Sequence, residues 1–250
     1  MIQLKSSREI DLMADGGRIL AATVQMLRRE VRAGISTEDL DRIAEAFIRS
    51  HPGATPAFKG LYGFPGTLCT SINQEIVHGI PSKKRVLKEG DIISIDVGVG
   101  YQGYFTDSAT TVAVGVIDAE TARLLETTER SLAAGIAAAM PGNHLGDIGA
   151  AVQRVVEEAG FSVVRDLVGH GIGVAFHEEP QVPNYGKAKR GLKLMPGLTL
   201  AIEPMVNIGG PATRTLADKW TIVTVDGSRS AHFEHTVAIT DSGNRVLTAA

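Results

Sequence analysis

The sequence predicts an α+β fold in one compact domain that is built from two similar halves. Two helical segments precede strand-like segments in the first half of the chain, and the same order returns in the second half. Short motifs also recur at a nearly constant interval: Asp39-Leu40 matches Asp147-Ile148, 108 residues later, and Ile95-Asp96 matches Ile202-Glu203, 107 residues later. Collinear matches in helices and strands indicate an internal repeat.

The repeat covers roughly residues 33–115 and 141–240, and no linker rich in proline or serine separates the two parts. We therefore expect residues 1–250 to form a single domain. Sheets from both halves should form a shared floor, with the helices packed on one side of it.

Two helices and three strands are expected in the first half. A capping box at Ser6 begins a helix that runs to about Arg29, and Ser36 begins a second helix that ends near Ser50. Runs rich in β-branched and apolar residues then predict strands over 67–73, 91–99 and 104–114.

The second half repeats this order. Asp118 caps a long helix, rich in alanine and leucine, that reaches about Met140, and residues 146–159 form another helix that Gly160 ends. Strands are predicted over 198–206, 220–225 and 232–239.

Composition excludes several classes of protein. With 44% hydrophobic and 21% charged residues in 250, the chain is typical of soluble globular proteins. Its net charge of −3, with scattered Lys and Arg, argues against nucleic acid as a primary ligand. Cys69 is the only cysteine, so no intramolecular disulfide can form, and there is no signal peptide or apolar run of about 18 residues. We expect a cytoplasmic protein without a membrane segment.

The segment 95–107 predicts a β-hairpin that carries two carboxylates on one face. A turn at Tyr101-Gln102 would place Asp96 directly opposite Asp107. Facing residues lie roughly 4.5–5.5 Å apart at Cβ, where like charges repel. Because burying such a pair in apolar strands is costly unless a cation lies between them, the hairpin predicts a metal site.

The same segment also matches the dinucleotide-binding pattern G-x-G-x-x-G at Gly98, Gly100 and Gly103. That pattern must begin a helix. Here β-branched and aromatic residues follow, which indicates a second strand, so the hairpin with a metal site is the better interpretation.

Three more residues complete a candidate ligand set. Glu203 and Glu234 lie in strand-like apolar segments, and His170 lies between two glycines that allow a ligand to approach closely. Four carboxylates balance the charge of two divalent cations, whereas one cation would leave two negative charges in excess. A nitrogen and oxygen donor set without thiolate favours Mn, Fe, Co or Zn.

These residues stand in motifs that resemble type I methionine aminopeptidases, which have the pita-bread fold: two pseudo-symmetric halves with helices on a curved, largely antiparallel sheet. The resemblance extends from the first helix to about Thr248, and its motifs are Val77-His78-Gly79-Ile80-Pro81, Asp96 to Asp107, Gly169-His170-Gly171-Ile172-Gly173, Phe176-His177-Glu178-Glu179-Pro180, Ile202-Glu203-Pro204-Met205 and Glu234-His235-Thr236. It implies that two divalent metal ions are held by Asp96, Asp107, His170, Glu203 and Glu234, with Asp107 and Glu234 bridging.

The resemblance also implies the activity, which is hydrolytic removal of N-terminal methionine from nascent proteins and peptides with a small, uncharged second residue. Glu203 would act as ligand and proton shuttle, His177 would stabilise the oxyanion, and His78 would position the amide nitrogen. We expect a monomer; transient contact with the ribosome is left open by the sequence.

The methionine side chain would lie in an apolar pocket formed by Phe58, Phe64, Cys69, Phe176 and Trp220. Some family members carry Cys, Tyr and Tyr where this chain has Phe58, Leu61 and Phe64, and His in place of Tyr62. For Phe64 and Phe176, ordinary core packing explains the residues equally well.

Two rival functions remain. A prolidase or Xaa-Pro aminopeptidase shares the fold but typically has an additional N-terminal domain, for which there is no room before Ser36. A pita-bread binding protein without activity would have lost ligands, whereas all five are present here.

Overall fold

The computed structural model describes residues 2–249; Met1 and Ala250, the ends of the expected domain, lie outside the described residues. The first half of the chain contains α1 (Ser7–Glu30), α2 (Thr37–Arg49), β1 (Ala54–Pro56), the short 3₁₀ helix η1 (Leu61–Gly63), β2 (Leu68–Ile72), β3 (Glu75–Val77), β4 (Ile92–Tyr101) and β5 (Tyr104–Ala113). The predicted capping box is confirmed, because the Ser6 hydroxyl accepts a hydrogen bond from Glu9 N and the Glu9 carboxylate accepts one from Ser6 N.

The second half begins with two further helices, which the sequence also predicted. Its elements are α3 (Ala119–Ala138), α4 (Leu145–Glu158), β6 (Ser162–Val163), β7 (Gly169–Gly171), β8 (Glu178–Val182), β9 (Thr199–Ile202), β10 (Met205–Asn207), β11 (Thr213–Thr215), β12 (Ile222–Thr224), β13 (Ser230–His232), β14 (His235–Thr240) and β15 (Gly243–Val246). The short strands β1, β3, β6, β7, β8, β11 and β15 were not predicted, because two to five residues give too little periodicity.

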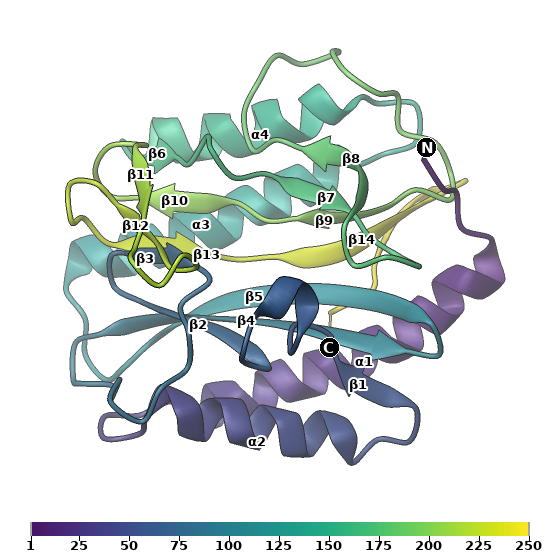
Figure 1. Cartoon of the computed structure of the whole chain (residues 1–250). Coiled ribbons are helices and arrows are strands. Elements are labelled where there is room, and N and C mark those ends of the chain that lie inside the picture. The colour runs from purple at the N-terminus through teal and green to yellow at the C-terminus, as the bar shows by residue number, and fades with distance from the viewer. Residues whose placement is uncertain (1, 250) are drawn as a thin grey trace.

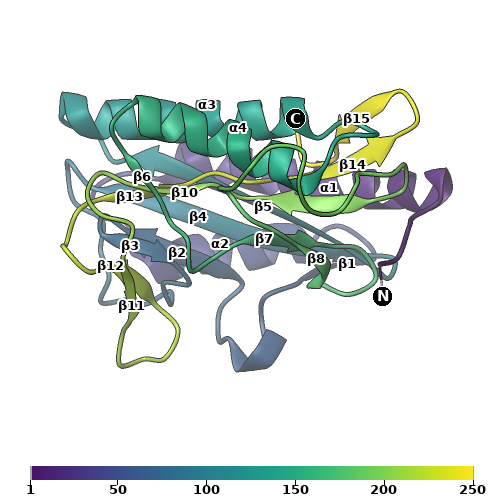
Figure 2. The same ribbon diagram turned by 90° about the horizontal axis from the view of Figure 1, so that it is seen from above.

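Contrary to our expectation, the helices do not all lie on one side of the strands: α1 and α2 lie along one side and α3 and α4 along the other (Figure 1), because each pair packs on the strands of its own half. Figure 2, from above, shows that β3, β11, β12 and the loop with η1 gather on the face away from α3 and α4. Every strand pairing is antiparallel, including β4 with β5, β14 with β9 and β7 with β9. None of the helices within residues 2–249 is long and apolar enough to cross a membrane.

Each helix pair buries its apolar side against its own group of strands. Leu20 and Leu40 of α1 and α2 pack in one core with Ile95 of β4, and Ile148 of α4 packs in another with Ile202 of β9. All five side chains are fully buried, which is worth roughly 1.5–3 kcal/mol for each. The two cores hold the strands, and therefore the polar side chains between them, in fixed positions.

The register of the β4–β5 hairpin differs from the prediction. Tyr101 pairs with Tyr104, so Asp107 faces Gly98, and Asp96 faces Ala109 rather than Asp107. The two-residue turn consists of Gln102 and Gly103, both with positive φ of 48° and 87°, as in a type I′ turn. Because the register is shifted by two residues, the two aspartates still point to the same face of the sheet, as diagonal neighbours.

Two predicted strands are each interrupted where a carboxylate stands. The expected strand 198–206 is divided into β9 and β10 at Glu203-Pro204, and the strand 232–239 into β13 and β14 at Phe233-Glu234. On one side of the breaks β9 pairs with β14, and on the other side β10 pairs with β13 in a separate sheet. Pro204 has no N–H to donate to a ladder, which favours a break there. Both glutamates therefore lie at the crossover between two sheets.

The two halves are joined beside these carboxylates. Asp107 N donates to Thr236 Oγ1 at 2.9 Å, and that hydroxyl donates to Asp107 O at 2.8 Å. Glu234 N donates to Ala109 O at 2.9 Å, while Ser108 Oγ donates to Glu234 O at 2.7 Å. β5 of the first half thus lies against residues 234–236 of the second half, and Asp107 and Glu234 come together.

Candidate metal centre

A cavity of about 580 Å³ opens between the two halves. All the site residues predicted from the sequence line it: Phe58, Phe64, Cys69, His78, Asp96, Asp107, His170, Phe176, His177, Glu203, Trp220 and Glu234. The structure therefore brings the whole predicted set together, with acidic residues in one part and aromatic residues in another.

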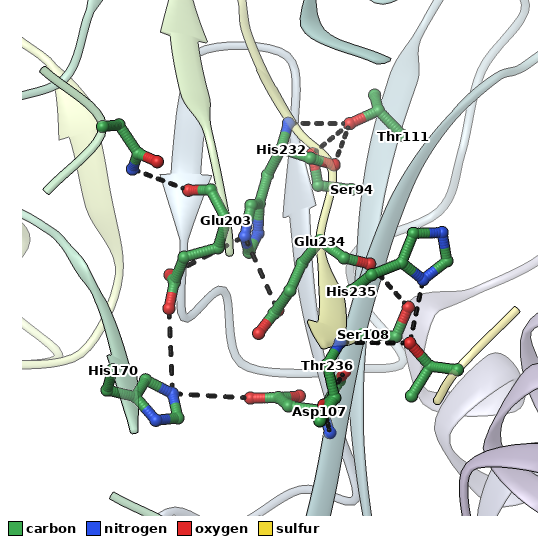
Figure 3. Close-up of polar contacts among 12 residues, drawn as sticks. Ser94, Asp107, Ser108, Thr111, His170, Glu203, His232, Glu234, His235 and Thr236 are labelled. Carbon is green, nitrogen blue, oxygen red and sulfur yellow. Dashed lines mark hydrogen bonds and ion pairs between the residues drawn. The ribbon is translucent and has the colours of Figure 1, made fainter. Parts of the chain in front are cut away.

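The acidic part collects side chains from both halves (Figure 3). His170 Nε2 lies 3.9 Å from Asp107 Oδ2 and 3.7 Å from Glu203 Oε1. Asp107, His170 and Glu234 each offer one donor atom, and these three atoms lie within 4.8 Å of one another. Two ligand atoms that each lie about 2.1 Å from one cation can be at most about 4.2 Å apart, so the separations of His170 Nε2 from Asp107 Oδ2 and Glu203 Oε1 suit shared coordination.

The four carboxyl groups are held where their charged forms are unfavourable. Burial raises the pKa of Asp96 to about 7, although a hydrogen bond from Asp107 opposes the rise. Burial, followed by the charges of neighbouring carboxylates, raises the pKa of Asp107, Glu203 and Glu234 well above the ordinary range. A cation placed among them would stabilise all four ionised forms.

Unpaired oxygen atoms test whether these residues fit a metal. Asp96 Oδ1, Asp107 Oδ1 and Glu234 Oε1 are buried and have no hydrogen-bond partner among residues 2–249. An unpaired buried polar atom costs roughly 1–3 kcal/mol, and more when it is charged. Burial also lowers the pKa of His170 to about 4, so that its imidazole is neutral and able to donate a lone pair. The donor set fits divalent cations.

Two further histidines stand over this centre. His177 lies close to His170, with ring centroids 4.4 Å apart, and Tyr62 stacks on it at 5.7 Å with 25° between the ring planes. His78 follows β3 and has a positive φ of 61°, a conformation that is unusual for a residue other than glycine and is concentrated at functional sites. Burial lowers the pKa of His78 to about 4 and also lowers that of His177, so both are neutral at pH 7.

The apolar part of the cavity is a set of edge-to-face aromatic pairs. Phe58 and Phe176 have ring centroids 5.3 Å apart, and Phe64 and Trp220 have centroids 5.1 Å apart, each pair at 74°. Cys69 is buried beside them, directly across from Asp96 in the β2–β4 pairing. The aromatic set therefore both packs with the core and faces the cavity.

Among the cavity residues that were given no role from the sequence, two contact predicted site residues directly. His232 lies between Glu203 and Glu234, and Tyr62 covers His177. His232 stands two residues before Glu234 in a strand-like segment, and residues at this spacing share a face, which was the available signal. Tyr62 carried no such signal, because its position depends on the loop that contains η1.

Comparison with known proteins agrees with a metal-dependent hydrolase. Residues 11–241 match the model of metallopeptidase family M24. The chain belongs to this family.

Within the family, the chain is similar to methionine aminopeptidases. It is 53% identical over 248 residues to methionine aminopeptidase 1 of Bacillus subtilis, and the match covers 99% of each protein. The crystal structure of methionine aminopeptidase from Thermotoga maritima superposes with a TM-score of 0.98 at 43% identity, over 100% of both chains. The fold is therefore the pita-bread fold that the sequence predicted.

The prolidase from Pyrococcus horikoshii shares the fold at a lower level. Its TM-score is 0.80 at 22% identity, and the match covers 99% of this chain but 63% of the prolidase. That likeness concerns the architecture alone.

Proposed function

We propose that this protein is a methionine aminopeptidase that removes N-terminal methionine from nascent proteins and peptides, with a preference for a small, uncharged second residue. The observation that carries the proposal is that one cavity joins a buried cluster of four carboxylates and His170 to an aromatic pocket. Full-length similarity to methionine aminopeptidases supports it.

The proposed centre would hold two divalent ions through Asp96, Asp107, His170, Glu203 and Glu234, of which Asp107 and Glu234 would serve both ions. Four carboxylates with a neutral imidazole balance two divalent charges, and this donor set suits Co, Mn, Fe or Zn. When bound, such ions polarise a carbonyl group and lower the pKa of water toward neutrality.

The protein's own groups would then guide the proton and the peptide. Glu203 borders the centre and the open cavity, so we assign it to take the proton of the attacking water and pass it to the leaving amine. His177 would donate a hydrogen bond to the developing oxyanion, and His78 would hold the amide nitrogen of the scissile bond. Tyr62, stacked on His177, keeps that imidazole in place.

The aromatic pocket explains the choice of side chain. Phe58, Phe64, Cys69, Phe176 and Trp220 present ring faces, ring edges and a sulfur atom, which suit a flexible thioether at about 0.3–1.5 kcal/mol for each sulfur–aromatic contact. The adjacent metal centre would bind a free α-amine through its nitrogen lone pair, so that only the first residue of a peptide fits. In a formylated amine this lone pair is delocalised into the formyl carbonyl and cannot bind a metal, so deformylation must come first.

Residues 1–250 would act as one catalytic domain with an internal repeat, as a monomer in the cytoplasm. Two helices followed by strands in each half support the repeat. Transient contact of this protein with the ribosome that synthesises the nascent chain is compatible with this role, but the chemistry does not require it.

Metal depletion and re-addition test the function. The protein is stripped with chelator, and release of the first residue from Met-Ala-Ser, formyl-Met-Ala-Ser and Ala-Pro-Ala is followed as Mn²⁺ or Co²⁺ is added back. We expect release from Met-Ala-Ser alone, abolished by Asp107→Asn and unaffected by Asp241→Asn, which alters an exposed aspartate. Cleavage of Ala-Pro-Ala alone would assign the protein to the Xaa-Pro enzymes.

Two other results would contradict the proposal. Equal cleavage of the formylated and free peptides would rule out recognition of the α-amine. Absence of cleavage with metal bound would favour a binding protein that has kept the centre.

A further inference from the structure

His232 lies at the floor of the metal centre, on the opposite side of Glu203 from His170. Its Nε2 lies 3.9 Å from Glu203 Oε2 and 3.8 Å from Glu234 Oε2, and its side chain is 2% exposed. Figure 3 shows the imidazole between the two carboxylates. The two oxygens of Glu203 thus face different imidazoles, since Oε1 lies 3.7 Å from His170 Nε2.

These separations are too long for hydrogen bonds, which span about 2.7–3.2 Å between nitrogen and oxygen. They are instead within the limit of about 4.2 Å for two atoms that bind the same cation. The distances around His232 match those around His170, which is 3.7 Å and 3.9 Å from its two carboxylate oxygens. The geometry that fits His170 as a ligand fits His232 equally well.

Both ring nitrogens of His232 are buried without a hydrogen-bond partner among residues 2–249. Its backbone, by contrast, is held by two hydrogen bonds. His232 N donates to Thr111 Oγ1 at 2.9 Å, and that hydroxyl donates to His232 O at 2.9 Å. Pairing of His232 with Met205 fixes the strand as well. A buried imidazole without partners is costly, and coordination of Nε2 would remove part of that cost.

We propose that His232 is a further ligand of the metal centre and binds through Nε2, which gives the centre an imidazole at each end. The inference rests on the metal centre of the proposed function and adds one nitrogen donor to it. A second imidazole favours Zn, Fe or Co over Mn, since carboxylate-rich sites suit Mn better. The choice of metal then depends on His232 as well as on the carboxylates.

The test counts imidazoles directly, without substrate. The protein is loaded with two equivalents of Co²⁺, and proton NMR records the exchangeable ring N–H resonances that the paramagnetic ion shifts, with ¹⁵N-labelled histidine to identify them. We expect two strongly shifted resonances from coordinated imidazoles in the wild type, and His177→Gln identifies any further shift that arises from proximity to the ion alone. His232→Gln should remove one, His170→Gln should remove the other, and His235→Gln should remove neither, because His235 contacts Thr248 Oγ1 instead.

Metal affinity supplies a second readout, measured by competition with a chelator. His232→Gln should weaken one Co²⁺ site about tenfold or more, whereas His235→Gln should change it less than about twofold. One shifted resonance in the wild type, or unchanged affinity in folded His232→Gln, would overturn the inference. If His232→Gln does not fold, the wild-type spectrum compared with that of His177→Gln decides the matter.

Failure of this inference and failure of the proposed function are distinguishable. Metal-dependent cleavage of Met-Ala-Ser with a single shifted resonance would refute the role of His232 alone. Absence of stoichiometric Co²⁺ binding in the wild type would refute both.

Discussion

Asp107 lies directly opposite Gly98 in the β4–β5 pairing, and the space beside Gly98 is filled by aromatic rings of the apolar pocket. A Cβ atom on Gly98 would lie 2.7 Å from Phe176 Cε2 and 3.0 Å from Phe58 Cε1. The strand that carries Asp96 therefore also forms one wall of the pocket. Gly98 therefore lies between the proposed metal-binding aspartates of this strand pair and the aromatic rings of the pocket.

Gly98→Ala should disturb the pocket more than the centre. The added methyl group displaces Phe176, which we expect to cost about 1–3 kcal/mol of unfolding free energy and to raise KM for Met-Ala-Ser more than it lowers kcat. Denaturant unfolding and steady-state kinetics measure the two effects. Phe176→Leu should partly relieve the clash in a double-mutant cycle; strictly additive effects would contradict this account.

Tyr62→Ala should weaken the positioning of His177. Loss of the stacked ring should remove about 0.5–1.5 kcal/mol of transition-state stabilisation, which lowers kcat/KM by roughly 2- to 12-fold. Tyr62→Phe keeps the ring, and its kcat/KM should stay within about twofold of the wild type, because the hydroxyl lies a long 3.4 Å from His177 Nδ1. Equal losses in both variants would show that the hydroxyl, rather than the ring, holds His177.

Arg85→Met should loosen the segment that carries His78. Arg85 pairs with Glu75 and donates to Ile80 O at 2.7 Å, while Glu75 accepts from Ile72 N at 2.8 Å. These contacts fix both ends of the segment that contains His78, and their loss should cost about 1.5–3 kcal/mol and lower kcat/KM. Thermal unfolding and kinetics check this.

Lys84→Met is the matched control for Arg85→Met, since Lys84 is exposed. It should leave stability and activity nearly unchanged. A wild-type kcat/KM in folded Arg85→Met would mean that the pair does not position His78.

Metal-free protein should lose stability as the pH rises from about 6.5 to 8.5. The pKa of Asp96 is raised to about 7 and that of Glu203 well above its ordinary range, so the folded state binds more protons than the unfolded state. Stability from such groups is present at low pH and is lost as the pH rises through the folded pKa.

Histidines act in the opposite direction, but at lower pH. The pKa values of His78 and His170 are lowered to about 4, so their contribution to stability grows up to the unfolded value of about 6.5 and is constant above it. The carboxyl groups therefore determine how stability changes with pH above pH 6.5. Thermal unfolding with and without Co²⁺ measures the slope, and a metal-free protein with constant or rising stability from pH 6.5 to 8.5 would contradict the prediction.

Local signals made the elements of this fold predictable. Caps at Ser6, Ser36 and Asp118 begin helices as expected, because a side-chain oxygen near the first turn satisfies backbone N–H groups whatever the rest of the chain does. The types of donor were predictable as well, since carboxylates in apolar strands need a cation.

The hairpin shows where local signals end. A shift of two residues leaves every side chain on its original face, so the alternation of apolar and polar residues fits both registers equally well. The positive φ of Gln102 and Gly103 selected the register, and through it placed Asp107 opposite Gly98.

The sequence by itself thus determined which residues form the helices and strands and which of them carry ligand chemistry, because caps, periodicity and the cost of buried charge are properties of short segments. Only the tertiary structure decided how those residues meet. The crossover of two sheets at Glu203 and Glu234, and the entry of His232 between them, depend on pairings between strands about 30 residues apart. Such pairings are fixed by packing of the whole core, which no short segment encodes.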